Sequence, residues 1–261
     1  ITCDISGYGE SSDVADKKAY DFLVQAESGL VGISGSPNEL GRIGVSMVDA
    51  GTGMTAYYGV LEAIIQRGIT GKGSGVRVSL FDVAADWMTV PLTQHDFGAG
   101  GPTRVGLKHP TIAPYGAFET SDGSLTLISI QNEREWVRLC DQALGSPEMA
   151  TDARFDSNAN RVANRDALES DMNRIIGALD QSTFQSGLAD ASIAYGNVSS
   201  LADLSSHPAL RRRTVHTSTG QTVELPAHPV RWTELPGMVD RPGGRVPTIG
   251  EHTDTIRAEF A

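Results

Sequence analysis

The stretch GVSMVDAGTGMTAYYGVLEAIIQRGITGKGSGVRVSLFD, residues 44–82, decides the fold class of this chain. Large apolar residues recur in it at the i, i+3, i+4, i+7 spacing of one helix face. They are Met54, Tyr57, Tyr58, Leu61, Ile64 and Ile65. Asp49 and Thr52 are both suitable N-caps for this helix, and Gly68 is suited to follow its C-terminal end. A glycine-rich turn and a strand at 76–82 come next, which together predict an α/β unit.

The segments before and after this stretch extend the α/β pattern. ITCDIS, residues 1–6, alternates in the manner of a strand, and the apolar residues between 20 and 30 fit a short amphipathic helix. Residues 43–48 are predicted to form a short strand or an extended lead into the main helix. A further helix is predicted over 80–95.

A long irregular segment separates this part from the next. FGAGGPTRVGLKHPTIAPYG, residues 97–116, holds five glycines and three prolines, which exclude regular structure. A loop of this length inside a compact domain is often functional. Beyond it the sequence predicts a hairpin with its turn at 121–123, and helices over 133–145 and 161–179. Strand patterns then return at Val215, 221–225 and 228–232.

Charge and composition exclude several classes of function. The 21 Lys and Arg against 32 Asp and Glu give a net charge of −11, which argues against a nucleic-acid-binding protein. No apolar run approaches the roughly 20 residues that span a bilayer, so no membrane partner is expected. Two cysteines, Cys3 and Cys140, cannot build a disulfide framework, which makes the cytoplasm the expected location. The histidines and cysteines lack metal-site spacing, so no metal is predicted.

Common nucleotide and hydrolase motifs are missing from the sequence. GITGKGSG, residues 68–75, has the glycine spacing of a phosphate-binding loop, but Lys72 precedes the second glycine and does not follow it. A tight turn is the favoured interpretation. There is also no Gly-x-Ser-x-Gly elbow of a serine hydrolase.

Asp49 is the candidate catalytic residue. It ends the apolar segment GVSMV and stands just before the predicted helix, with glycines at 51 and 53 that allow close approach to the backbone. A carboxylate there would face unpaired backbone N–H groups and the positive end of the helix dipole. Such a group can act as a nucleophile or as an ordinary N-cap, and the spacing leaves both interpretations open.

Several motifs in a fixed order reveal a family resemblance. They are DISGYGE, KKAYDFLVQAESGL, VDAGTGM, QRGITGKGSGVRVSLFD, HPTIAPYGAFETSDGSL, IAYGNVSSLADLSSHPAL and PTIGEHTD. Together they resemble the class III CoA-transferase family, the CaiB–BaiF group that includes formyl-CoA transferase-like proteins. The resemblance runs along essentially all 261 residues.

The resemblance implies an α/β fold with a Rossmann-like large domain, an inserted small α+β domain and an interlocked homodimer. Residues 1–95 would form the C-terminal part of the first half of the large domain, and 96–111 a linker and active-site loop. Residues 112–205 would form the small domain, and 206–261 a return segment and tail. Because the resemblance starts at a late strand, we expect the N-terminal portion, which supplies much of the family's CoA-binding surface, to lie outside this chain.

The resemblance also implies the chemistry. Asp49 matches the family nucleophile, which attacks an acyl-CoA thioester and passes CoA to a small carboxylic acid through aspartyl anhydride and aspartyl-CoA intermediates. The stretches HPTIAPYGAF and QNEREW look like members that act on dicarboxylic acids. CoA would be the substrate carrier, and no other cofactor is implied.

Six further residues are predicted to contact substrate. Lys18 matches a CoA-contacting position and Tyr20 one that lines the active site, although a surface lysine and a core tyrosine are the simpler interpretations. Gly106 and His109 lie in the loop that covers the active site. A dicarboxylate would need a cation for its distal carboxylate, and Arg42 and Arg104 are the candidates.

Two other functions remain open at this point. An α-methylacyl-CoA racemase of the same superfamily would need a histidine before the aspartate, where this chain reads Ala19-Tyr20-Asp21. That departure favours the transferase. The chain could also be an inactive fragment that lacks the CoA-binding half.

Overall fold

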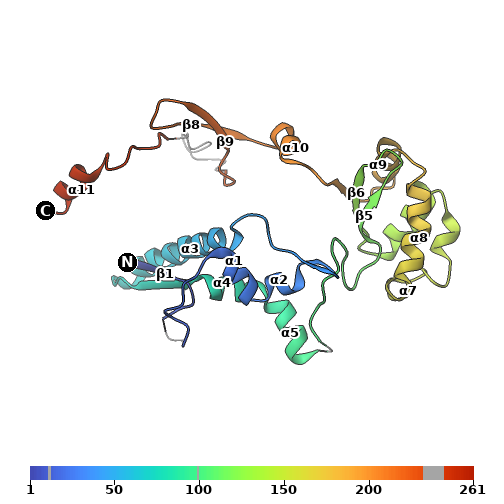
Figure 1. Ribbon diagram of the computed structural model, residues 1–261, viewed down its shortest axis with the longest axis horizontal. Helices are drawn as coiled ribbons and strands as arrows, with labels where there is room; N and C mark the ends of the chain where they lie inside the picture. Colours follow the sequence, from blue (N-terminus) through green and yellow to red (C-terminus); the bar gives the residue numbers. More distant parts are fainter. Residues whose placement is uncertain (11–12, 99, 232–243) are drawn as a thin grey trace. The chain divides into compact units, whose positions relative to one another are not determined.

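The structure of this chain is a computed structural model (Figure 1). It describes residues 1–10, 13–98, 100–231 and 244–261. The positions left out are 11–12, 99 and 232–243. The chain divides into two compact units, Ile1–Asn197 and Val198–Ala261. Within the described ranges no helix has the length and apolar character needed to cross a membrane.

The first unit opens with the predicted α/β arrangement. β1 (Thr2–Ser6) and β4 (Gly75–Ser79) pair in parallel, with Thr2 opposite Gly75. Parallel neighbours require a crossover connection, and α3 (Met47–Thr70) supplies it and contacts both strands. The prediction of an α/β class is confirmed.

Helix α3 is longer than the sequence predicts. It begins at Met47, so Asp49 lies in its first turn and does not cap it, and the extended lead expected up to residue 48 is cut short. At the other end Gly68 stays helical. The helix ends where Gly71 adopts a left-handed φ of 71° and donates its N–H to the carbonyl of Arg67. Both predicted helix ends were therefore wrong.

Small residues line the face of α3 that packs in this unit. A Cβ atom on Gly59 would lie 2.9 Å from Cγ1 of Val76, and one on Gly51 would meet the ring of Trp87. The periodic apolar stripe that predicted the helix is exposed instead, including Met54 and Ile65. Helix α3 thus approaches β4 and the following helix through its small residues, and its apolar stripe stays outside this core.

Two helices complete the packing around the start of α3. They are α1 (Asp21–Glu27) and α4 (Leu80–Trp87), and both contact α3. The small core between them holds Tyr8, Val24, Val48 and Ala84. Glycine is required in the turn after β1, because a Cβ atom on Gly7 would lie 2.4 Å from that of Ala19.

The helix predicted over 80–95 is broken into α4 and α5 (Thr89–Phe97). The break falls at Met88. Pro91 accounts for it, since proline has no N–H to donate to the carbonyl of Trp87 four residues earlier.

Short elements link α1 to α3. They are α2 (Leu30–Ile33) and an antiparallel pair, β2 (Gly35–Ser36) and β3 (Glu39–Leu40). Gly35 has a φ of 99°, and a Cβ there would lie 2.3 Å from the carbonyl oxygen of Glu39, so the tight pair depends on glycine at this position.

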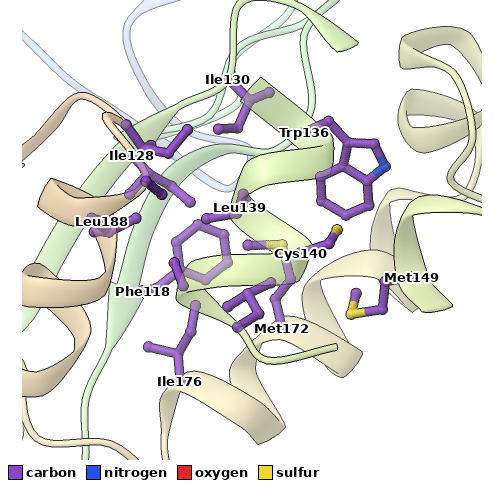
Figure 2. Close-up of a cluster of buried hydrophobic side chains, with 14 of the residues drawn as sticks. Phe118, Ile128, Ile130, Trp136, Leu139, Cys140, Met149, Met172, Ile176 and Leu188 are labelled. Atoms are coloured by element: carbon purple, nitrogen blue, oxygen red, sulfur yellow. The ribbon is translucent and has the colours of Figure 1, made fainter. Parts of the chain in front are cut away.

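The remainder of the first unit is an α+β assembly with its own core. β5 (Tyr115–Glu119), β6 (Leu125–Ser129) and β7 (Tyr195–Asn197) form an antiparallel sheet in that order, which confirms the predicted hairpin. The helices are α6 (Glu133–Arg138), η1 (Leu139–Ala143), η2 (Pro147–Ala150), α7 (Asn158–Ala163), α8 (Arg165–Ile176) and α9 (Gln181–Asp190). Figure 2 shows side chains from the sheet and these helices meeting in one cluster around Leu139 and Met172.

The second unit is small. It contains α10 (Leu201–Ser206), the antiparallel pair β8 (Arg212–His216) and β9 (Thr222–Pro226), and α11 (Thr253–Glu259). The predicted strands at Val215 and 221–225 are confirmed in outline. The strand predicted at 228–232 is wrong for residues 228–231, which form none, and residue 232 lies outside the described residues.

Candidate active site

The carboxylate of Asp49 is exposed at the N-terminal end of α3. Asp49 is the third residue of the helix, between buried Val48 and exposed Ala50. Ser46 precedes the helix, but its side chain makes no capping hydrogen bond. The first turn that carries Asp49 therefore lacks the local cap that most helices use.

A distant aspartate caps this turn instead. Oδ2 of Asp21, in the first turn of α1, accepts the backbone N–H of Val48 at 2.7 Å and that of Asp49 at 3.3 Å. Asp21 is only 7% exposed. A buried carboxylate thus replaces the missing cap and holds the backbone of Asp49.

Gln25 extends the same network to the segment before α3. Its Nε2 donates to Oδ1 of Asp21 at 2.6 Å, while its Oε1 accepts the backbone N–H of Ile43 at 3.0 Å. Gln25 is fully buried. One face of α1 therefore holds both ends of the segment that leads into α3.

The first backbone N–H groups of α3 all have acceptors. Met47 donates to the carbonyl of Val45, Ala50 donates to that of Ser46, and Val48 and Asp49 donate to Asp21. The sequence interpretation placed unpaired backbone N–H groups opposite the carboxylate of Asp49. That expectation was wrong, because Asp21 already occupies two of them.

The two glycines that follow Asp49 have different surroundings. A Cβ on Gly51 would lie 2.3 Å from Cζ2 of Trp87, so Gly51 serves the packing of α3 on α4. A Cβ on Gly53 would meet nothing within 4 Å. Of the two glycines, only Gly53 leaves open space beside the helix, so the predicted close approach to the backbone remains a prediction for Gly53 and does not fit Gly51.

Lys18 and Tyr20 lie in the segment that enters α1. Tyr20 precedes the first residue of α1 and is 70% exposed, so it is not a core tyrosine. The two adjacent lysines differ. Lys17 forms an ion pair with Glu27 and lies 5.4 Å from the centre of the Tyr8 ring, whereas exposed Lys18 has no polar partner among the described residues.

The two predicted carboxylate-binding arginines also differ in their contacts. Arg42 donates weakly to the carbonyl of Ile43, at 3.4 Å, and its guanidinium lies 5.7 Å from the centre of the Phe22 ring. Arg104 donates to three backbone carbonyls at 3.1–3.2 Å. These belong to Gly32, Ser36 and Pro37. Most of the hydrogen-bonding capacity of Arg104 thus fastens the loop to the turn around β2.

Gly106 and His109 lie in two differently anchored parts of the loop. Gly106 has a φ of 67° and donates its N–H to the carbonyl of Gly35, next to the Arg104 contacts. The ring of His109 lies 5.3 Å from that of Tyr115, and its carbonyl accepts from Arg165 at 2.7 Å.

Side chains of α7 and α8 hold the end of the loop in place. Arg165 also donates to the carbonyl of Ile112, and Arg161 donates to that of Ala113 at 2.7 Å. Arg161 is 1% exposed and pairs with Glu133 at 2.7 Å. Hydrogen bonds from Arg161 lower the pKa of the Glu133 carboxyl below its usual range.

Hydrogen bonds thus connect Asp49 and, through the backbone of Ile43, Arg42 to one network centred on Asp21 and Gln25, and Tyr20 precedes Asp21 in the chain. Arg104 and Gly106 share a second anchor on the turn around β2, and His109 a third. No hydrogen bond or ion pair joins these groups directly within the described residues, and no cluster of three His, Cys, Asp or Glu side chains there could hold a metal ion.

Comparison with known proteins identifies the family. Residues 1–253 match CoA-transferase family III. This chain belongs to that family. Among class III CoA-transferases it is 31% identical over 258 residues to the acetyl-CoA:oxalate CoA-transferase of Acetobacter aceti, across 98% of this chain and 65% of that protein. It is 29% identical to the succinyl-CoA:glutarate CoA-transferase of Mus musculus, across 99% of this chain and 59% of that protein.

A solved structure supports the fold. A CaiB/BaiF family protein from Brucella suis matches with a TM-score of 0.77 at 28% identity, across 99% of this chain and 67% of that one. The predicted resemblance to the CaiB–BaiF group is confirmed. This chain of CoA-transferase family III spans 59–65% of the length of the two relatives named above.

Sequence reasoning missed the roles of Asp21 and Gln25. Asp21 stands in the triplet Ala19-Tyr20-Asp21, which was weighed only for the histidine that a racemase would need. The spacing of Asp21 and Gln25, one helical turn apart on a short amphipathic helix, was the available signal. Nothing local linked that turn to Asp49.

Proposed function

We propose that this chain carries the nucleophile of an acyl-CoA:carboxylate CoA-transferase, and that Asp49 is that nucleophile. The observation that carries the proposal is the position of Asp49: an exposed carboxylate on a helix turn whose backbone is held by a buried network. Carboxylates form covalent intermediates when they are accessible and fixed in place. Membership of CoA-transferase family III agrees with this chemistry.

The proposed reaction proceeds through covalent intermediates of two kinds, aspartyl anhydrides and an aspartyl-CoA thioester. An oxygen of Asp49 attacks the thioester carbonyl of the donor, and the C–S bond breaks to give an aspartyl–acyl anhydride and CoA thiolate. The thiolate attacks the aspartyl carbonyl and releases the donor acid, leaving an aspartyl-CoA thioester. The acceptor carboxylate then attacks the aspartyl carbonyl and displaces the thiolate, giving an aspartyl–acceptor anhydride. The thiolate finally attacks the acceptor's acyl carbon in this anhydride, which releases the new CoA thioester and the Asp49 carboxylate. No electrons are exchanged with a further cofactor.

We propose a dicarboxylic acid as one substrate. The relatives are named for oxalate and glutarate. Arg42 is the better candidate for the distal carboxylate, because among the described residues only one weak hydrogen bond engages it, whereas Arg104 is held by three carbonyls. Lys18, with no polar partner among the described residues, is the candidate for the CoA phosphates, and Tyr20, Gly106 and His109 are candidates for the rest of the pocket.

An interlocked homodimer and a cytoplasmic location are part of the proposal. The exposed apolar stripe of α3, from Met54 to Ile69, supports burial against further protein. Cys3 and Cys140 are both free thiols, in keeping with a reducing compartment.

The test is to trap the covalent intermediates. The purified protein is incubated with acetyl-CoA or succinyl-CoA, then treated with hydroxylamine, digested and analysed by mass spectrometry. We expect a hydroxamate on Asp49, and loss of CoA transfer to oxalate or glutarate in Asp49→Asn. Exposed Asp86 on α4 is the control, and Asp86→Asn should remain active.

Two results would contradict the proposal. Full transfer activity in Asp49→Asn would exclude Asp49 as the nucleophile. Deuterium incorporation at the α-carbon of a methylacyl-CoA, without CoA exchange, would favour the racemase. Absence of both activities would point to the inactive fragment.

A further inference from the structure

Asp21 is a buried carboxylate that the proposed reaction does not use. It is 7% exposed, and no cationic side chain pairs with it among the described residues. Burying a carboxylate is unfavourable unless hydrogen bonds compensate for lost hydration. Here the compensation comes from the amide of Gln25 and the N–H groups of Val48 and Asp49. All of these contacts converge on the turn that carries Asp49.

This turn depends on Asp21 for its local order. The first turn of a helix lacks intrahelical acceptors for its N–H groups, and Ser46 does not provide a substitute. Without Asp21, the buried N–H of Val48 would have no acceptor, and the turn would fray. Asp49 would move with it, since its own backbone N–H is the second donor to Oδ2.

Gln25 fixes the orientation of Asp21. It donates from Nε2 to Asp21 while it accepts from the N–H of Ile43 at Oε1, so its amide cannot flip without losing both bonds. Each of the three hydrogen bonds along Ile43, Gln25, Asp21 and Val48 therefore has a matched donor and acceptor, and Asp21 accepts from both of its neighbours.

We infer that Asp21 is a positioning residue for CoA transfer, which sets the carboxylate of Asp49 for attack by hydrogen-bonding the first turn of α3 in an arrangement oriented by Gln25. This inference rests on the proposed function of Asp49. Attack on a thioester requires the reacting oxygen to approach to about 3–3.5 Å in the correct direction, and a misplacement of about 1 Å can cost on the order of 10²-fold in rate. Asp21 acts through Asp49 and need not touch substrate.

The experiment exchanges the carboxylate of Asp21 and the amide of Gln25 between the two positions. In Asp21→Asn, the new amide must place its NH₂ against the NH₂ of Gln25 if it is to accept from Val48. In the double variant Asp21→Asn with Gln25→Glu, the amide of residue 21 donates to the carboxylate of residue 25, which still accepts from Ile43. Donor–acceptor complementarity is thereby restored with the same net charge as the native pair.

Turnover with succinyl-CoA as donor is then compared. We expect Asp21→Asn to lower kcat on the order of 10²-fold, with KM changed less than about threefold. The kcat of the double variant should be at least about tenfold higher than that of Asp21→Asn. Hydrogen exchange at the amides of Val48 and Asp49 should rise in the single variant and return in the double one. Asp180→Asn is the control, because Asp180 caps α9 through the N–H of Thr183, and it should leave kcat unchanged.

The outcomes are distinct. Three results would overturn the inference. They are an unchanged kcat in Asp21→Asn, a rise in KM without a fall in kcat, and a kcat of the double variant no higher than that of the single variant. Failure of the proposed function is seen separately, in an Asp49→Asn variant that keeps its activity. The exchange measurement needs no turnover, so it tests the hydrogen bonds in either case.

Discussion

The indole ring of Trp87 occupies the space beside the backbone of Gly51, two residues after the candidate nucleophile. A Cβ atom on Gly51 would lie 2.3 Å from Cζ2 and 2.4 Å from Cη2 of that ring. The ring is rigid and belongs to α4, so it cannot yield as the end of a flexible side chain would. Contact between α3 and α4 at this point thus requires glycine.

Replacing Gly51 should destabilise the chain, while replacing Gly53 should not. Gly51→Ala forces the two helices apart, and overpacking of this kind costs about 1–3 kcal/mol. Gly53→Ala adds a methyl group in open space within a helix and should stabilise by about 0.5–1 kcal/mol. Urea unfolding of both variants measures the difference. Equal stability of the two variants would show that the Trp87 contact does not constrain α3.

Arg161 should be the most costly single charge to remove from the α+β part. It is 1% exposed and donates to Ala113, Phe155 and Glu133, the first two through their backbone carbonyls. Arg161→Met leaves those two buried carbonyls without their donor, and each buried polar group left unsatisfied costs about 1–3 kcal/mol. Arg174→Met, at an exposed side chain of α8, is the control, and thermal unfolding is the measurement. A shift no larger than that of the control would contradict this role.

Glu133 should make this contribution pH-dependent. Hydrogen bonds from Arg161 lower the pKa of the Glu133 carboxyl in the folded state. A lowered folded pKa means that the stabilisation is fully present above the unfolded pKa of about 4.3 and is lost as the pH falls through the folded value. The difference in unfolding temperature between the native chain and Glu133→Gln should therefore be largest near neutral pH and shrink below about pH 4. If the difference in unfolding temperature grew on acidification, the stabilising role of the ionised Glu133 carboxylate would be contradicted.

Local sequence patterns were sufficient to predict most helices and strands, but not which face of a helix would be buried. The helix of residues 47–70 was visible from its apolar stripe, yet α3 packs in its unit through Gly51, Ala56, Gly59 and Ala63. Close helix packing through glycine leaves no periodic hydrophobic signal. The apolar stripe predicted that a helix exists, and it gave no indication that the opposite face would be buried.

The candidate site could be predicted only in part for the same reason. Asp49 was found from its local context before a helix and from family motifs. Asp21 is separated from Val48 by 27 positions, and its role arises only when α1 packs against the start of α3. A helix predicted to be capped by its own Asp49 gave no reason to look for an outside cap.

Cys140 should resist thiol reagents until the chain unfolds. Burial raises the pKa of its thiol to about 12, so almost no thiolate is present at neutral pH. Cys3 is exposed on β1. An aromatic disulfide reagent should thus label Cys3 in the native chain and Cys140 only in denaturant, and Cys3→Ser should remove the fast reaction. Rapid native labelling of Cys140 would contradict its burial in the cluster of Figure 2.

Arg42 and Arg104 should respond differently to the same substitution. Arg42→Ala removes a cation with one weak backbone hydrogen bond, so we expect a rise of at least tenfold in KM for glutarate, with stability almost unchanged. Arg104→Ala breaks three hydrogen bonds between the loop and residues 32–37, at a net cost of about 0.5–1.5 kcal/mol each. It should therefore lower stability and speed proteolytic cleavage of the loop. Steady-state kinetics with a dicarboxylate and a monocarboxylate acceptor distinguish substrate binding from loop anchoring. Loss of the contact to a distal carboxylate raises KM only for the dicarboxylate. If Arg104→Ala raised KM for glutarate selectively and left proteolysis unchanged, Arg104 would be the substrate cation and Arg42 would lose that assignment.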